Sequence, residues 1–196
     1  YWTTQMRDAV EASVDRGVNL IVLGGNTAYN RIDINGETIS GVTTWRDLGR
    51  PEVTLLGSQY LSLGFKRDMV VETSLWPFDV LKPGAVIKGV VGYEADTPIT
   101  FNGPPVETIA RSSILPFEKS IPSMATYYTR PSGAGALNMA TNGWVCAMED
   151  RCPWGHRFDK ATQRQIRAVT ENILKGAALG PLGNWRMAFT QYNAPS

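Results

Sequence analysis

The sequence predicts an α/β domain built on a mostly parallel sheet flanked by helices, with a β-rich segment inserted in its middle. An amphipathic helix pattern is followed directly by the apolar run Leu20–Leu23, and uninterrupted runs of this kind are typical of strands covered on both faces. A second helix pattern lies near the other end of the chain. Between them, residues 41–81 are rich in Gly, Pro and aromatic residues without helical periodicity, which indicates inserted loops and short strands.

Length and composition predict one hydrophobic core. The chain has 196 residues, of which 43% are hydrophobic, and a formal net charge of +1. We therefore expect residues 1–196 to form a single α/β domain. The dispersed charges argue against a basic face for nucleic acid, and no apolar run approaches the ~20 residues that span a membrane. Helical patterning begins almost at Tyr1, so we expect an N-terminally incomplete part of a larger protein.

The first helix is expected at Gln5–Arg16. Thr4 is placed to cap it and Gly17 to end it. Its apolar positions recur at helical spacing, whereas Arg7 and the acidic residues point elsewhere, as on a surface helix with one buried stripe. Leu20–Leu23 should then be an interior strand, parallel to its neighbours.

Further along the chain, turn residues separate the predicted strands. Asn35-Gly36 predicts a hairpin with a type I′ turn, and the apolar run Ala85–Val91 predicts another buried strand. Met124–Thr129 and Ala136–Ala140 read as strands joined by a glycine-rich turn. The second helix is expected at Lys160–Lys175, capped by the residue before it and with its apolar stripe ending near its last turn.

Familiar catalytic signatures are missing. The order of helix, strand and the turn Gly24–Thr27 resembles the class I glutamine amidotransferase-like fold, in which such a turn carries the nucleophile. No Cys or Ser stands in a G-x-C-x-G or G-x-S-x-G setting, so amidotransferase chemistry is not expected. His156, the only histidine, lies in a loop-like context and is expected to face solvent or make a local hydrogen bond. P-loop and dinucleotide fingerprints are absent as well.

Cys146 and Cys152 leave two interpretations open. A zinc site usually needs four ligands, and His156 adds only one candidate. A disulfide in a tight loop would suit an exported protein, and two ordinary thiols would suit the cytosol. The localisation is therefore cytoplasmic or exported, and a bridge would favour the exported alternative.

Seven short motifs are distributed along the chain. They are Tyr1–Thr3, Met6–Val10, Leu23–Tyr29, Val91–Asp96, Ser132–Gly135, Thr141–Val145 and Val169–Asn172. Together they resemble the C-terminal region of the large (beta) subunit of N,N-dimethylformamidase, and the resemblance covers essentially the whole chain. It implies an amide hydrolase with a mononuclear iron held by tyrosine and glutamate side chains.

The resemblance also implies which residues bind the iron. Tyr29 matches the tyrosine after the family's G-G-N turn, and Glu94 matches the glutamate of its G-Y-E element. Phenolate and carboxylate are hard oxygen donors that suit Fe³⁺, a cation that activates water or polarises a formamide carbonyl. The family's second tyrosine ligand has no identified counterpart and could lie upstream of Tyr1. Glu94 and Asn26 are the candidate catalytic residues, although we favour for Asn26 the role of satisfying backbone groups in its turn.

Each of these residues also has an ordinary structural interpretation. Tyr29 could be a packed aromatic residue, and Glu94 a surface acid at a strand end. The predicted function is an iron-dependent hydrolase of a small amide, with a small partner subunit or further copies of the chain as partners. The alternatives are a non-catalytic binding or scaffold domain of the same fold, or a carbohydrate-related protein whose six tryptophans stack on sugars.

Overall fold

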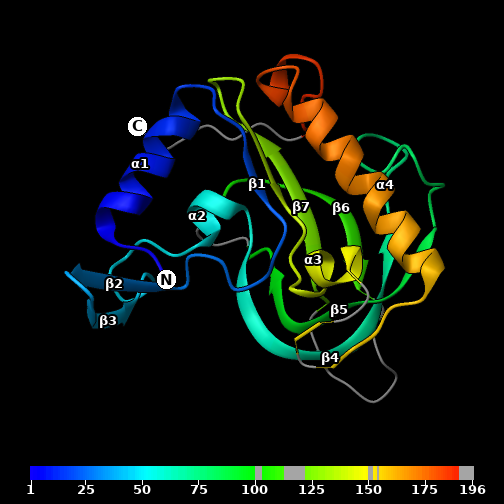
Figure 1. Ribbon diagram of the computed structural model, residues 1–196. Helices are drawn as coiled ribbons and strands as arrows, with labels where there is room; N and C mark the ends of the chain where they lie inside the picture. The colour runs from blue at the N-terminus through cyan, green and yellow to red at the C-terminus, as the bar shows by residue number, and fades with distance from the viewer. Residues whose placement is uncertain (100–102, 113–121, 150–151, 154, 190–196) are drawn as a thin grey trace.

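The computed structural model describes residues 1–99, 103–112, 122–149, 152–153 and 155–189. Its elements, in chain order, are α1 Thr4–Asp15, β1 Leu20–Val22, β2 Asn30–Asn35, β3 Thr38–Thr44, α2 Val53–Leu56, β4 Gln59–Val71, β5 Val86–Thr97, β6 Glu107–Ser112, β7 Met124–Thr129, β8 Gly135–Asn138, α3 Gly143–Met148, α4 Lys160–Ala177 and the 3-10 helix Leu182–Asn184. A six-stranded sheet in the order β1-β8-β7-β6-β4-β5 forms the centre, and β2 and β3 form a separate hairpin beside it (Figure 1).

The prediction of a mostly parallel sheet is wrong. In the described sheet only β1 and β8 pair in parallel, and the other four neighbouring pairs are antiparallel. Antiparallel strands need only short connections, and β4–β5 and β7–β8 are joined without a helix. Leu20–Val22 is parallel to its neighbour, as predicted, but it lies at the edge of the sheet and not in its interior. The glutamine amidotransferase-like fold is not confirmed.

Strands β4 and β5 bend strongly. They have 13 and 12 residues, and their antiparallel register shifts at several places. Such bulges bend a strand and increase its twist. The last residues of β5 therefore reach the segment after β8, where Ala95 forms an isolated antiparallel bridge with Thr141 (Figure 1). Residues 41–81 are not an insertion, because they supply β4, a main strand of the sheet.

Two hydrophobic clusters hold the helices on the sheet. Helix α4 is capped by Asp159, as predicted, and contributes Ile166, Val169 and Ile173 to the larger cluster, together with residues of α3 and of the sheet. Leu174, expected in the same stripe, is 59% exposed. The smaller cluster joins α1 and α2 to β1 and comprises Val14, Val22, Leu55, Leu56 and Ala134.

Helix α1 differs from its prediction in two details. Its cap is Thr3, one residue earlier than expected. Arg7, expected to point away from the core, is fully buried. Its guanidinium donates to the backbone carbonyls of Arg50 and Pro51 and lies 4.7 Å from the ring centroid of Trp45. Helical spacing could not predict this position, because the acceptors come from a loop more than 40 residues away.

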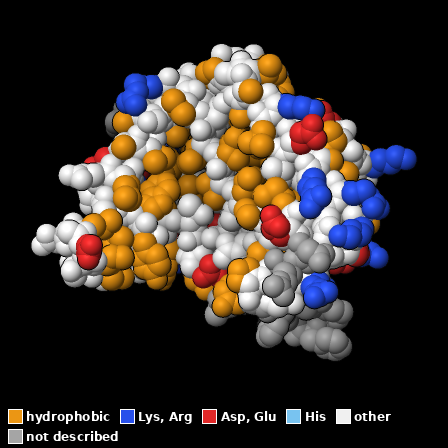
Figure 2. All heavy atoms as spheres, viewed as in Figure 1, with side chains coloured by type: hydrophobic (Ala, Val, Ile, Leu, Met, Phe, Trp, Pro, Cys, Tyr) orange, Lys and Arg blue, Asp and Glu red, His pale blue; other side chains and the backbone are white. Residues whose placement is uncertain are grey.

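The predicted hairpin forms with a different turn. Asn35 pairs with Thr38, so the two loop residues are Gly36 and Glu37. Only Gly36 has a positive φ, +59°, which corresponds to a type II′ turn and not to the expected type I′. Hydrophobic side chains gather on the surface near the hairpin (Figure 2), and its exposed apolar residues are Ile34, Ile39 and Val42.

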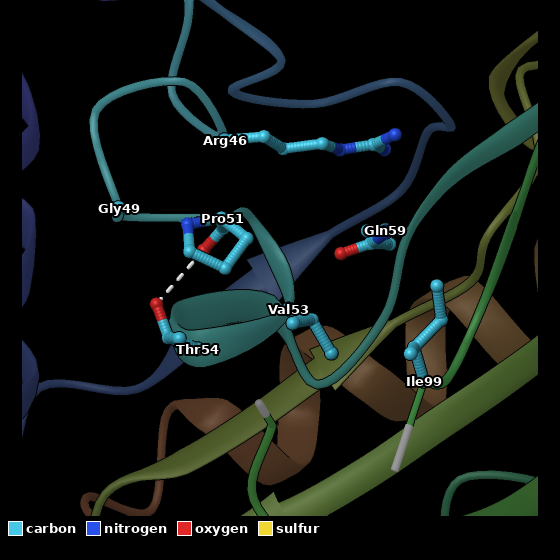
Figure 3. Close-up of a pocket in the computed structure, with 7 residues that line it drawn as sticks. All are labelled: Arg46, Gly49, Pro51, Val53, Thr54, Gln59 and Ile99. Carbon is cyan, nitrogen blue, oxygen red and sulfur yellow. Dashed lines mark hydrogen bonds between the residues drawn. The ribbon is translucent and has the colours of Figure 1, made fainter. Parts of the chain in front are cut away.

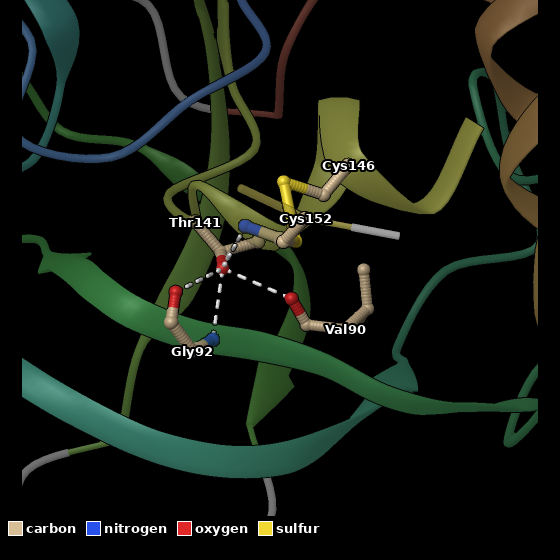
Figure 4. Close-up of a disulfide and its surroundings, with 6 residues drawn as sticks. Val90, Gly92, Thr141, Cys146 and Cys152 are labelled. Carbon is tan, nitrogen blue, oxygen red and sulfur yellow. Dashed lines mark hydrogen bonds between the residues drawn. A yellow bond between two sulfur atoms is a disulfide. The ribbon is translucent and has the colours of Figure 1, made fainter. Parts of the chain in front are cut away.

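Cys146 and Cys152 form a disulfide, with their Cα atoms 4.9 Å apart. The bond ties α3 to the segment that leads into α4 (Figure 4). Disulfides persist in oxidising compartments, so of the two interpretations of these cysteines the bridge favours the exported one. None of the described helices is long and apolar enough to cross a membrane.

Candidate active site

Residues with an unusual backbone conformation gather where β5 meets the segments that follow β1 and β8. In the part of the chain that the structure describes, the non-glycine residues with positive φ are Asn26, Ala28, Tyr93 and Ala140, with values from +53° to +66°. This conformation is uncommon for residues with a side chain. It persists where the surrounding structure imposes it, often at functional sites. The junction of these three segments is therefore the candidate active site.

Glycines allow the three segments to approach closely. A Cβ atom on Gly25 would lie 2.7 Å from the carbonyl oxygen of Glu94, and one on Gly143 would lie 1.9 Å from that of Val90. Both distances are too short for any other residue. The G-G-N turn after β1 thus lies directly against the backbone of β5 at Glu94.

Two side-chain amides hold the carboxylate of Glu94. Asn26 Nδ2 donates to Oε1 at 2.7 Å, and Asn142 Nδ2 donates to Oε2 at 2.6 Å. Asn26 Oδ1 is buried and has no hydrogen-bond partner in the described structure. From the sequence we expected Asn26 to satisfy backbone groups in its turn. Its side chain instead contacts Glu94. The structure thus brings together two of the three predicted site residues in one direct contact.

Asp96, two residues after Glu94, anchors the same turn from within the core. Its side chain is buried, with the residue 1% exposed. Oδ1 accepts the backbone N–H of Asn26 at 2.8 Å, and Oδ2 accepts from Asn138 Nδ2 at 3.2 Å. Burial raises the pKa of Asp96 to about 6, although these two hydrogen bonds act in the opposite direction. Asp96 lies within the motif Val91–Asp96, but nothing in the sequence distinguished it from a surface acid.

Tyr29, the third predicted residue, lies beside a second tyrosine. Its ring centroid is 5.5 Å from that of Tyr60, and Tyr60 pairs with Asp96 across β4 and β5. Burial raises the pKa of Tyr60 above its usual value, and electrostatic interactions with Glu94, Tyr29 and Asp96 add to this effect. No hydrogen bond of either phenolic hydroxyl occurs among the described residues. Sequence reasoning missed Tyr60 because it lies in the segment interpreted as an insertion.

Arg46 brings a positive charge to the two tyrosines. Its guanidinium carbon is 5.0 Å from the ring centroid of Tyr29, and its charge acts to lower the pKa of Tyr60. Two hydrogen bonds, of 2.9 and 2.8 Å, join Arg46 to the buried carboxylate of Glu52. This pairing fixes the guanidinium beside the ring of Tyr29.

Two cavities adjoin these residues. One, of about 390 Å³, lies between Arg46 on one side and Val53 and Ile99 on the other, with the amide of Gln59 directed between them (Figure 3). The other, of about 440 Å³, is lined mainly by apolar groups and reaches Asn142. Both have the size of small-molecule sites.

A match to a known protein family covers most of the chain. Residues 1–159 match the family described as N,N-dimethylformamidase beta subunit-like, C-terminal. The chain belongs to this family. No curated protein gives a significant match. The match includes every residue of the candidate active site, and it confirms the family resemblance that the short motifs indicated.

Tyr29, Tyr60 and Glu94 carry oxygen donors of the kind that ferric iron accepts as ligands. Among the described residues, no group of three or more His, Cys, Asp or Glu side chains is placed to hold a metal, but tyrosine is also a ligand for Fe³⁺. The negative charges around Tyr60 raise its pKa, and a strongly acidic cation among Tyr29, Tyr60 and Glu94 would offset them. The unpartnered Oδ1 of Asn26 offers an acceptor for a water molecule next to Glu94.

Other residues considered from the sequence lie elsewhere. His156 packs edge-on against Phe158, with ring centroids 4.4 Å apart, and burial followed by the charge of a nearby lysine lowers its pKa. Trp45 and Trp144 are fully buried in the core and cannot stack on a sugar. Trp154, another tryptophan considered for that role, lies outside the described residues.

Proposed function

We propose that this chain carries the active site of a hydrolase acting on a small amide, with ferric iron held by Tyr29, Tyr60 and Glu94. The proposal rests on one observation above all. In a chain of the dimethylformamidase beta subunit-like family, Tyr29 of the turn after β1 contacts Tyr60 of β4, and Asn26 of the same turn contacts Glu94 of β5. When bound, ferric iron supplies a Lewis acid that activates water and polarises the amide carbonyl.

The residues around the three ligands orient the reactants. Asn26 and Asn142 fix the carboxylate of Glu94, and Asn26 Oδ1 accepts a hydrogen bond from the attacking water. The oxygen of that water forms a bond to the carbonyl carbon, the C–N bond breaks, and the nitrogen leaves with a proton as the amine. The products are a carboxylic acid and an amine. The cavity beside Arg46 has room for a small amide and not for a polymer.

Because the family description names a beta subunit, the proposal includes a partner. We expect the active enzyme to contain a small partner subunit or several copies of this chain. Sedimentation of the purified protein, alone and after co-expression with its neighbouring reading frames, would distinguish a monomer from either assembly.

Iron content, visible absorption and hydrolysis of N,N-dimethylformamide test the function together. Tyrosinate bound to ferric iron absorbs visible light, so the wild-type protein should be coloured. Tyr29→Phe, Tyr60→Phe and Glu94→Gln should each lose colour, iron and amine release. Tyr1→Phe, at a residue that is 73% exposed, is the matched control and should keep all three.

Two results would count against the proposal. A wild-type protein that takes up no ferric ion would contradict the metal site and favour a non-catalytic domain. A Tyr60→Phe variant with undiminished colour and iron would show that Tyr60 is not a ligand. The second tyrosine ligand would then lie elsewhere in the protein.

A further inference from the structure

Asn142 contacts both segments that carry the proposed ligands. Its Nδ2 donates to Glu94 Oε2 at 2.6 Å, and its Oδ1 accepts the backbone N–H of Gly25 at 2.8 Å. Its own backbone N–H points to the carbonyl oxygen of Glu94 at 3.4 Å. One side chain therefore joins the turn after β1 to β5 at the carboxylate itself.

The backbone at Asn142 is held firmly on both sides. The preceding hydroxyl, on the fully buried Thr141, donates to the carbonyl of Val90 at 3.0 Å and accepts the N–H of Gly92 at 3.1 Å (Figure 4). Helix α3 begins directly after Asn142, and the disulfide ties this helix to the segment that follows it. The amide is thus presented from a rigid part of the fold.

Two amide donors restrict the carboxylate of Glu94 more than a single donor would. The terminal torsion of a glutamate is broad, so a single bond from Asn26 would leave the carboxylate plane free to turn. A second donor on the other oxygen fixes that plane, and each oxygen keeps a lone pair for a cation. We propose that Asn142 is a positioning residue, which holds Glu94 in the one orientation that binds the ion. The role in ion binding rests on the proposed function, whereas the contact itself does not.

Asn142→Asp tests the role of the donated hydrogen bond. Aspartate keeps the size of the side chain and its acceptor for Gly25, but it places a second carboxylate beside Glu94. It therefore removes the donor to Glu94 Oε2 and leaves two carboxylates that repel each other. Loss of a residue that orients a metal ligand typically lowers metal affinity by about 10–100-fold.

Ferric-ion affinity is therefore measured by competition with nitrilotriacetate. We expect Asn142→Asp to bind about 10–100-fold more weakly than wild type. Asn172→Asp is the matched control, because Asn172 Nδ2 also donates to a carboxylate at 2.6 Å, that of Asp79. It should match wild type. An unchanged affinity of Asn142→Asp would overturn the positioning role.

A second measurement uses the metal-free protein. If Asn142 donates to Glu94, Glu94→Gln should shift the NMR signals of the Asn142 side-chain amide and leave those of Asn172 in place. Asn142 signals that do not move would overturn the inference. A wild-type chain that binds no ferric ion while these signals do move would instead contradict the proposed function alone.

Discussion

The stability of Asp96→Asn relative to wild type should rise as the pH goes from acid to neutral. Asp96 is buried beside the candidate active site, and burial raises its pKa to about 6. Asparagine has the same size and no charge, and its Oδ1 can still accept the backbone N–H of Asn26. The variant therefore removes the cost of burying an ionised carboxylate and keeps the contact that anchors the turn. It also replaces the acceptor of Asn138 Nδ2 by a second amide donor, a cost that does not depend on pH.

The direction of the pH dependence follows from the two pKa values. The folded chain holds the Asp96 proton more tightly than the unfolded chain, in which the pKa is about 3.9. The stabilisation from the protonated acid is fully present below about pH 4 and is lost as the pH rises through about 6. A rise from 3.8 to about 6 corresponds to about 3 kcal/mol, of which about 2 kcal/mol falls between about pH 4.5 and about pH 7.5.

Urea unfolding of the metal-free proteins, followed by the fluorescence of the buried Trp45 and Trp144, measures this effect. The difference in unfolding free energy between Asp96→Asn and wild type should move by about 2 kcal/mol in favour of the variant as the pH rises over that range. Asp33→Asn, which removes a half-exposed carboxylate, is the control. A difference for Asp96→Asn that stays constant with pH would refute the reasoning.

Three further changes test contacts within the fold and at the site. Arg7→Met should lower the unfolding free energy by about 3 kcal/mol in urea, because two backbone carbonyls lose a buried donor; a wild-type value would contradict the buried network. Mass spectrometry without reductant should find Cys146 and Cys152 linked, and reduction should cost about 2 kcal/mol of stability; two free thiols would disprove the bridge. Gly25→Ala should cost about 1–3 kcal/mol and weaken ferric-ion binding, because its Cβ would lie 2.7 Å from the carbonyl of Glu94; unchanged melting and binding would show that the segments are farther apart.

Local sequence patterns predicted several elements of this chain, although not α2, α3, β4 or β6. Strand β7 has the predicted bounds, Met124–Thr129, and α4 begins at Lys160 after the predicted cap Asp159. Capping and turn preferences depend on residues within a few positions of one another, so they can be recognised without the fold. The same patterns did not predict strand order. An apolar run such as Leu20–Val22 indicates that a strand is covered, but not which strands lie beside it or in which direction they run.

The sequence by itself determined the family and, through its motifs, pointed to Tyr29, Glu94 and Asn26 as site residues. Only the tertiary structure decided how these residues meet. Asn26 and Glu94 are 68 residues apart in the chain and 2.7 Å apart in space, and Tyr60 and Asn142 join them from two further segments. These contacts depend on the bend that the register shifts of β4 and β5 produce. That bend arises from pairing between distant strands, and no local propensity specifies it.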